Sequence, residues 1–191
     1  MPKVVELSGQ LFKLKPADTI AEVNSVQRLD TETWPDGYKH YAALFDLDQN
    51  SIFVATDQSE DIASYVGVER IRDTDFKKGI PGWDHDSREF SHMEGKAWYI
   101  TGHVVNPKYA KVGLSASMID YLKEAAVALD IDQIAVVLRI NHPTLGKASR
   151  FWEKHDFTKL ENTYDPNWKA SPNAEDSGGV IYSFKLHPAK I

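Results

Sequence analysis

The chain contains no cysteine. This absence excludes a disulfide framework, a cysteine nucleophile and a metal site with cysteine ligands, and it fits a reducing compartment, so we expect a cytoplasmic protein. The sequence also lacks any run that approaches the ~20 apolar residues needed to span a bilayer, and its N-terminal segment has no long apolar core. We therefore expect no association with a membrane.

Positive charge is not in excess. The net charge is -6, and the charged residues, 26% of the chain, have both signs interspersed. This balance disfavours a broad nucleic-acid or anionic-membrane surface, so we expect neither as a partner. The 191 residues, of which 42% are hydrophobic and 11% aromatic, can enclose a core without covalent staples. We expect one domain over residues 1–191, as a monomer or a homodimer.

Hydrophobic periodicity predicts a mixture of strands and helices. Strands are predicted at 10–15, 51–56, 62–71, 97–105, 133–140, 157–162 and 180–186, and helices at 19–34, 38–47, 114–130 and 145–157. The segment 72–96 has no sustained period and indicates a long loop. Its stretch "WDHD" (83–86) with His92 has no defined ligand spacing, so we read it as a solvated surface and predict no metal site.

The strand, helix and strand at 97–105, 114–130 and 133–140 form a βαβ unit, whose two strands should run parallel with a right-handed crossover. The remaining strands should pair as antiparallel hairpins. The predicted fold class is therefore α/β (α+β): a mixed, mostly antiparallel central sheet flanked by helices, with the parallel strands 97–105 and 133–140 at its middle.

The turn before the long helix is made of small residues. Ala110, Gly113, Ser115 and Ala116 lie where the helix begins. A helix N-terminus presents unbonded N–H groups and the positive end of its dipole, so it binds phosphate when side chains leave the backbone open. The alternative is that Gly113 only tightens a turn between strand and helix.

The order of several motifs resembles the Gcn5-related N-acetyltransferase (GNAT) superfamily. The motifs are "VVNPKY", "AKVGLS", an apolar strand "IAVVLRI" and "ASRFWEKHDF", all within residues 97–157. The resemblance implies one acyltransferase domain in which the two parallel strands splay apart, with acetyl-CoA as cosubstrate. It also implies transfer of an acetyl group to an amine of a small molecule or a protein by direct attack on the thioester.

The same resemblance implies a set of cosubstrate-binding residues. The turn would hold the pyrophosphate, the end of the preceding strand would meet the pantetheine arm, and two later residues would contact the cosubstrate. In order, the set is Val104, Val105, Ala110, Lys111, Val112, Gly113, Leu114, Ser115, Ala116, Asn141 and Trp152. Within the motif, Ala110 replaces the usual Gln or Arg, Lys111 replaces a glycine, and Ser115 replaces a Gly or Ala.

The catalytic groups are less defined. Trp152 replaces the tyrosine that the family often uses to protonate the leaving thiolate, and an indole cannot serve as that acid. Tyr109, Tyr164 or a water would then donate the proton, or no group does. His103 and Glu69 are the candidate bases, each with a structural role as the alternative. A noncatalytic relative that binds acyl-CoA or a protein partner is the second hypothesis.

A nucleotide-binding α/β domain is a third hypothesis. The chain has neither GxxxxGK[ST] nor a complete GxGxxG motif, which disfavours it.

Overall fold

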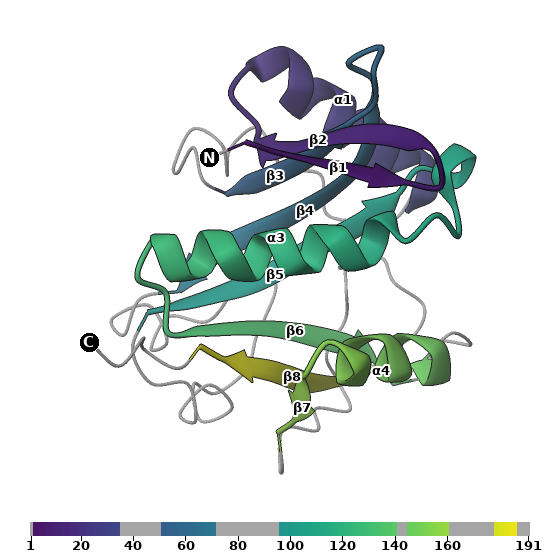
Figure 1. The fold of residues 1–191 in the computed structure, drawn as a ribbon. Helices are drawn as coiled ribbons and strands as arrows, with labels where there is room; N and C mark the ends of the chain where they lie inside the picture. The colour runs from purple at the N-terminus through teal and green to yellow at the C-terminus, as the bar shows by residue number, and fades with distance from the viewer. Residues whose placement is uncertain (1, 35–50, 72–95, 141–144, 161–177, 187–191) are drawn as a thin grey trace. The chain divides into compact units, whose positions relative to one another are not determined.

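The structure is a computed structural model that describes residues 2–34, 51–71, 96–140, 145–160 and 178–186 (Figure 1). Its elements are β1 (Lys3–Leu7), β2 (Gln10–Pro16), α1 (Ile20–Thr33), β3 (Ile52–Thr56), β4 (Ile62–Ile71), β5 (Ala97–Val105), the 3-10 turn η2 (Pro107–Tyr109), α3 (Leu114–Ala128), β6 (Gln133–Arg139), α4 (Leu145–Lys154), β7 (Thr158–Lys159) and β8 (Gly179–Lys185). No helix in these ranges is long and apolar enough to cross a membrane.

Several predictions fall on residues that the structure does not describe. They are the helix at 38–47, the loop at 72–96 apart from Lys96, the "WDHD" stretch with His92, Asn141, and Tyr164. The predicted strand at 157–162 is described only as far as Leu160.

The strands form one sheet in the order β1-β2-β3-β4-β5-β6-β8-β7. The pairs β1–β2, β2–β3, β3–β4, β6–β8 and β7–β8 are antiparallel. β5 and β6 begin side by side, because the N–H of Lys96 donates to Oδ2 of Asp132 and the N–H of Asp132 donates to the carbonyl of Lys96, both at 2.8 Å. Among the strands of the described residues, these two are the one parallel pair, which confirms the predicted mixed, mostly antiparallel sheet.

The chain forms two compact units, one from Met1–Glu69 with Ile100–Ala125 and the other from Arg70–Tyr99 with Ala126–Ile191. β5 begins in the second unit and ends in the first. The expectation of one domain over residues 1–191 stays a prediction.

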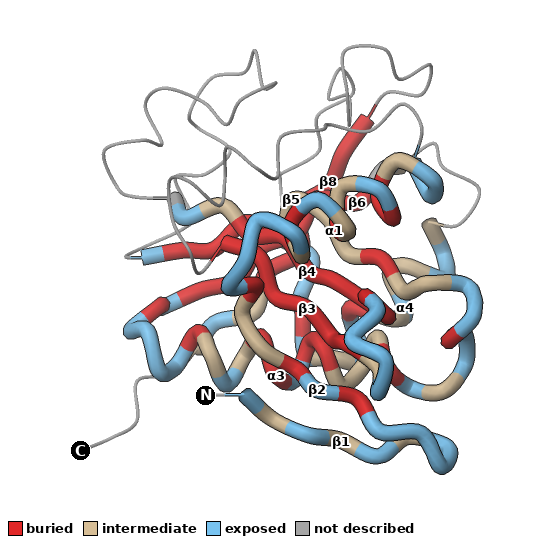
Figure 2. Tube along the Cα trace, turned by 90° about the horizontal axis from the view of Figure 1, so that it is seen from above, coloured by how far each residue is buried: buried red, intermediate tan, exposed pale blue. Residues whose placement is uncertain are grey.

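The first unit buries both faces of its strands. The face beneath α1 carries a cluster that we call the α1-face cluster, made of Ala17, Val23, Val26, Leu29, Ile52, Val54, Ile62, Tyr65 and Val104. Phe53 points to the opposite face, where its ring meets Tyr121 of α3 edge-on at 6.1 Å. Figure 2 shows that β3 and most of β4 are buried, whereas β1, at the edge of the sheet, is exposed or half-buried.

Strand β1 was not predicted. It pairs with β2 in a hairpin in which Leu7 lies opposite Gln10, and the two residues between them, Ser8 and Gly9, have φ of 52° and 77°. Two successive left-handed residues make the turn that matches the twist of paired strands. The dipeptide Ser-Gly was therefore the sequence signal for this hairpin.

Two helices end before their predicted ends, and for the same reason. In α3, Asp130 has φ of 55° and the N–H of Ile131 donates to the carbonyl of Ala126 at 2.9 Å. In α4, Asp156 has φ of 63° and the N–H of Phe157 donates to the carbonyl of Trp152 at 3.0 Å. A left-handed residue followed by this backward bond is the Schellman ending, here with Asp in the place of the more usual Gly.

The second unit pairs β6 with β8 along their whole length, from Gln133 opposite Lys185 to Arg139 opposite Gly179. β7 adds to the other side of β8, which confirms the predicted terminal hairpin. Trp152 of α4 is buried against Phe157, with ring centroids 4.8 Å apart, and Phe157 lies 5.7 Å from Phe184 of β8. These aromatic contacts hold the end of α4 on the sheet.

Candidate functional site

The end of β5 is fixed to β4. The N–H of Asn106 donates to the carbonyl of Ala63 at 2.9 Å, and Oγ of Ser64 donates to the carbonyl of Val104 at 2.8 Å. The side chain of Val104 is buried, while His103 and Val105 are half-buried. These bonds fix the position of the C-terminal end of β5, where the following turn begins.

The turn from Ala110 to Gly113 is short and open. Lys111 and Gly113 both have left-handed backbone, with φ of 69° and 89°. A Cβ built on Gly113 meets nothing within 4 Å, so the space beside it is empty. Ala110, Lys111 and Gly113 are exposed. The predicted small-residue turn is thus present, directly before α3 begins at Leu114.

This turn presents consecutive backbone N–H groups. Within the described residues, none of the N–H groups from Lys111 to Ala116 donates a hydrogen bond, and the first that does is that of Ser117, to the carbonyl of Gly113 at 3.2 Å. Successive N–H groups in a turn with left-handed residues form a concavity that binds anions, and the helix dipole adds to it. This arrangement can hold a phosphate or pyrophosphate.

Tyr109, the residue before the turn, is anchored. Its ring meets Phe12 edge-on at 5.3 Å and is 4% exposed. Its hydroxyl donates a short hydrogen bond to Oδ2 of Asp57. Burial, and then this bond, raise the pKa of Tyr109, while the hydrogen bond from Tyr109 lowers the pKa of Asp57. Tyr109 therefore keeps its proton at neutral pH, and that proton is directed at Asp57.

Two lysines lie at the turn. Nζ of Lys108 is 3.7 Å from Oδ2 of Asp57 and 4.9 Å from the centre of the Tyr109 ring, and these neighbours, first Tyr109 and then Asp57, raise the pKa of Lys108. The side chain of Lys108 is still 66% exposed. Lys111 is exposed and makes no ion pair within the described residues. Both can add positive charge beside an anion.

The two predicted bases lie on opposite faces of the sheet, because successive side chains of a strand alternate. Val104 belongs to the α1-face cluster, so His103 faces the other side, where its Nε2 lies 3.3 Å from Oγ of Ser115. On β4, Tyr65 belongs to the α1-face cluster, and the half-buried Glu69 lies four residues further along, on the face of Tyr65. The structure does not bring His103 and Glu69 together.

Residues 20–157 match the acetyltransferase (GNAT) family. The chain belongs to this family. The match extends from the start of α1 past the end of α4, so it includes the turn at Ala110–Gly113.

Several solved structures share the fold. Ard1 from Thermoplasma volcanium aligns with a TM-score of 0.66 at 12% identity, over 92% of this chain and 98% of Ard1. Naa50 from Arabidopsis thaliana, in complex with the bisubstrate analogue CoA-Ac-MVNAL, aligns with a TM-score of 0.66 at 15% identity, over 92% and 99%. NAA60 from Arabidopsis thaliana, in complex with acetyl-CoA, aligns with a TM-score of 0.68 at 14% identity, over 92% and 98%. A sequence search of curated proteins gave no match.

Trp152, one of the predicted cosubstrate contacts outside the turn, is in the second unit. The indole is 5% exposed, and its ring centroid lies 5.2 Å from that of Phe151. Asn141, the other predicted cosubstrate contact outside the turn, lies beyond the described residues. The roles of both residues stay predictions.

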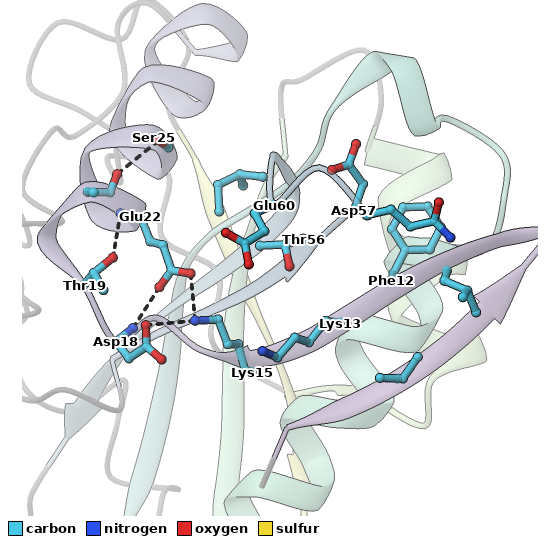
Figure 3. Close-up of a pocket in the computed structure, with 15 residues that line it drawn as sticks. Phe12, Lys13, Lys15, Asp18, Thr19, Glu22, Ser25, Thr56, Asp57 and Glu60 are labelled. Atoms are coloured by element: carbon cyan, nitrogen blue, oxygen red, sulfur yellow. Dashed lines mark hydrogen bonds and ion pairs between the residues drawn. The ribbon is translucent and has the colours of Figure 1, made fainter.

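A separate pocket of about 610 Å³ lies between the β1–β2 hairpin, the start of α1 and the β3–β4 turn (Figure 3). None of the predicted site residues lines it. Two carboxylates of the pocket form ion pairs with Lys15, that of Asp18 at 2.8 Å and that of Glu22 at 2.7 Å. Burial opposes the charge of Lys15, but these two bonds outweigh it and raise its pKa. Asp57, the acceptor of Tyr109, lies at one end of this pocket.

Proposed function

We propose that this GNAT protein is an acetyl-CoA-dependent N-acetyltransferase that moves an acetyl group to an amine of a small molecule or a protein. The observation that supports this most is the run of N–H groups from Lys111 to Ala116 at the start of α3, which find no acceptor among the described residues and lie within the stretch that matches the family. Relatives of the same fold have been solved with acetyl-CoA or with CoA-bearing analogues.

The chain's residues fit the cosubstrate at the pyrophosphate. The N–H groups of Lys111 to Ala116 would bind the phosphate oxygens, and the open space at Gly113 leaves room for them. Lys108 and Lys111 would add charge, and the backbone at Val104 and Val105 would meet the pantetheine arm. Acetyl-CoA supplies the acetyl group as a thioester, whose carbonyl carbon the amine attacks. The chain has no cysteine, so no acetyl-cysteine enzyme can form.

A base must take a proton from the attacking amine, and geometry decides which group can do so. His103 contacts Ser115 in the first turn of α3, which also presents the free N–H groups. Glu69 points to the opposite face. One of the two, and not both, is therefore the base of this proposal, and His103 is favoured by its position beside the turn.

Two measurements test the proposal in sequence. CoA should raise the melting temperature of the protein, because a ligand that binds the folded state stabilises it by about 2.7 kcal/mol at a hundredfold excess over Kd. Acetyl-CoA with a panel of amines should then release free thiol. The panel should include peptide N-termini, since the analogue bound to Naa50 carries a peptide. No melting shift with CoA at a concentration of about 1 mM would contradict the proposal.

A noncatalytic CoA-binding protein is the second candidate. It is favoured by Trp152, a buried indole with no titratable proton at the position of the family's acid. This candidate predicts a melting shift with CoA but no thiol release with any amine.

A further inference from the structure

The anion-binding turn lies between two buried residues. Tyr109 before it is 4% exposed and Leu114 after it is 1% exposed, while Ala110, Lys111 and Gly113 between them are exposed. Within the described residues, the last hydrogen bond before the turn is from the N–H of Ala110 to the carbonyl of Pro107, at 3.1 Å. The position of the turn's N–H groups therefore depends on how firmly Tyr109 is held.

Asp57 provides a fixed acceptor for Tyr109. Its Oδ1 accepts the N–H groups of Ser59 at 2.8 Å and Asp61 at 3.0 Å, and its own N–H donates to the carbonyl of Asp61 at 3.0 Å. These bonds close the turn between β3 and β4 and orient the carboxylate. Its side chain is 14% exposed, and its Oδ2 receives the hydroxyl of Tyr109. Figure 3 shows Asp57 and Phe12, the two residues that hold Tyr109, at the same end of the pocket.

We infer that Asp57 is a positioning residue for the cosubstrate: through the hydroxyl of Tyr109, the β3–β4 turn holds the Ala110–Gly113 turn in the geometry that binds the pyrophosphate. Asp57 touches neither the phosphate nor the reacting atoms in this role. The inference rests on the proposed function, because it assigns the turn to CoA. It adds a tether between two turns that lie 52 residues apart in the sequence.

The two ends of the tether can be tested separately. Tyr109→Phe removes one hydroxyl and keeps the ring against Phe12, so the fold is retained. Asp57→Asn keeps an oxygen for the backbone N–H groups and turns its amide NH2 toward the Tyr109 hydroxyl, so a weaker neutral hydrogen bond replaces the one to a carboxylate. Each should raise the Kd for CoA by about three- to thirtyfold, the usual range for a residue that acts on a ligand through a neighbour. The Kd of the double variant for CoA should exceed that of the weaker-binding single variant by no more than about twofold, because both substitutions act on the same hydrogen bond.

Tyr182→Phe is a matched control. Its hydroxyl donates to Oε1 of Glu153 at 3.4 Å, so the variant also removes a tyrosine–carboxylate bond, in the second unit. Calorimetric titration with CoA should give this control the wild-type Kd. Once an amine substrate is known, Asp57→Asn should raise the KM for acetyl-CoA and leave kcat within about twofold, since it alters binding and not the chemical step.

The outcomes separate the inference from the proposed function. If the wild type binds no CoA, the proposed function fails and the inference fails with it. If the wild type binds CoA and Tyr109→Phe binds it equally well, only the inference is overturned. A control that loses as much affinity as Tyr109→Phe would also overturn it, because the loss would then reflect general destabilisation.

Discussion

Nε2 of His103 lies 3.3 Å from Oγ of Ser115. This contact joins the end of β5 to the first turn of α3 across the open turn between them. It places the imidazole beside the N–H groups that we assign to the pyrophosphate, on the face of the sheet opposite Glu69. Because of its contact with Ser115, His103 is the candidate base to test first.

His103→Gln should lower kcat for thiol release by about 10²- to 10⁴-fold, the usual cost of removing a general base. Ser115→Ala should lower it less, because it removes a partner of the ring and not the ring itself. Glu69→Gln is the comparison. Because Glu69 and His103 lie on opposite faces of the sheet, only one of the two substitutions should cause the large loss of kcat. CoA binding must be intact in each variant, as measured by the melting shift. If neither His103→Gln nor Glu69→Gln changes kcat by about threefold, both assignments are wrong.

Gly113→Glu should abolish the rise in melting temperature that CoA produces. It places a side chain and a negative charge in the empty space where the phosphate would lie. Gly113→Ala is the control, since its Cβ meets nothing within 4 Å and its cost is about 1–2 kcal/mol of stability from the left-handed backbone. We expect Gly113→Ala to melt lower without ligand and still respond to CoA. A normal CoA response in Gly113→Glu would remove the turn from the binding site.

The family and the sheet were predictable because their signals are local or ordered along the chain. The βαβ unit, the hairpin at β3–β4 and the open turn before α3 each follow from a short pattern, and the structure has all three. α3 and α4 end earlier than predicted because Asp130 and Asp156 take the left-handed conformation, which sequence rules assign first to Gly. β1 was missed although Ser8-Gly9 marked its turn.

The tether was not predictable from the sequence. Asp57 reads as an ordinary turn residue and Tyr109 as part of a motif, and nothing in the sequence relates two residues 52 positions apart. The same holds for the opposite faces of His103 and Glu69, which depend on the pairing of their strands with the α1-face cluster. Long-range pairs of this kind come from tertiary packing, which local patterns do not encode.

Acid should remove the contribution of the Asp57–Tyr109 bond to stability. The bond from Tyr109, helped by those from Asp61 and Ser59, holds the pKa of Asp57 below its usual value. A carboxylate with a lowered folded pKa stabilises the protein above its unfolded pKa of about 3.9, and this stability is lost as the pH falls through the folded pKa. Urea unfolding should therefore show Tyr109→Phe less stable than the wild type at about pH 7, with the difference shrinking below about pH 4. A difference that stays constant with pH would show that the hydroxyl does not act on the charge of Asp57.

Trp152→Tyr tests whether the native protein lacks a proton donor for the leaving thiolate. Aminolysis of the thioester expels a CoA thiolate, which a tyrosine hydroxyl at this position of α4 can protonate and an indole cannot. We expect turnover that equals or exceeds that of the wild type, measured as thiol release at saturating acetyl-CoA. The smaller ring leaves space beside Phe157, so the variant should lose about 1–3 kcal/mol of stability in urea unfolding.

Trp152→Phe is the matched control, because it removes a similar volume without adding a hydroxyl. If Trp152→Phe gives the same turnover as Trp152→Tyr, the hydroxyl is not the donor; if neither the wild type nor Trp152→Tyr releases thiol with any amine while both bind CoA, the noncatalytic candidate replaces the enzyme.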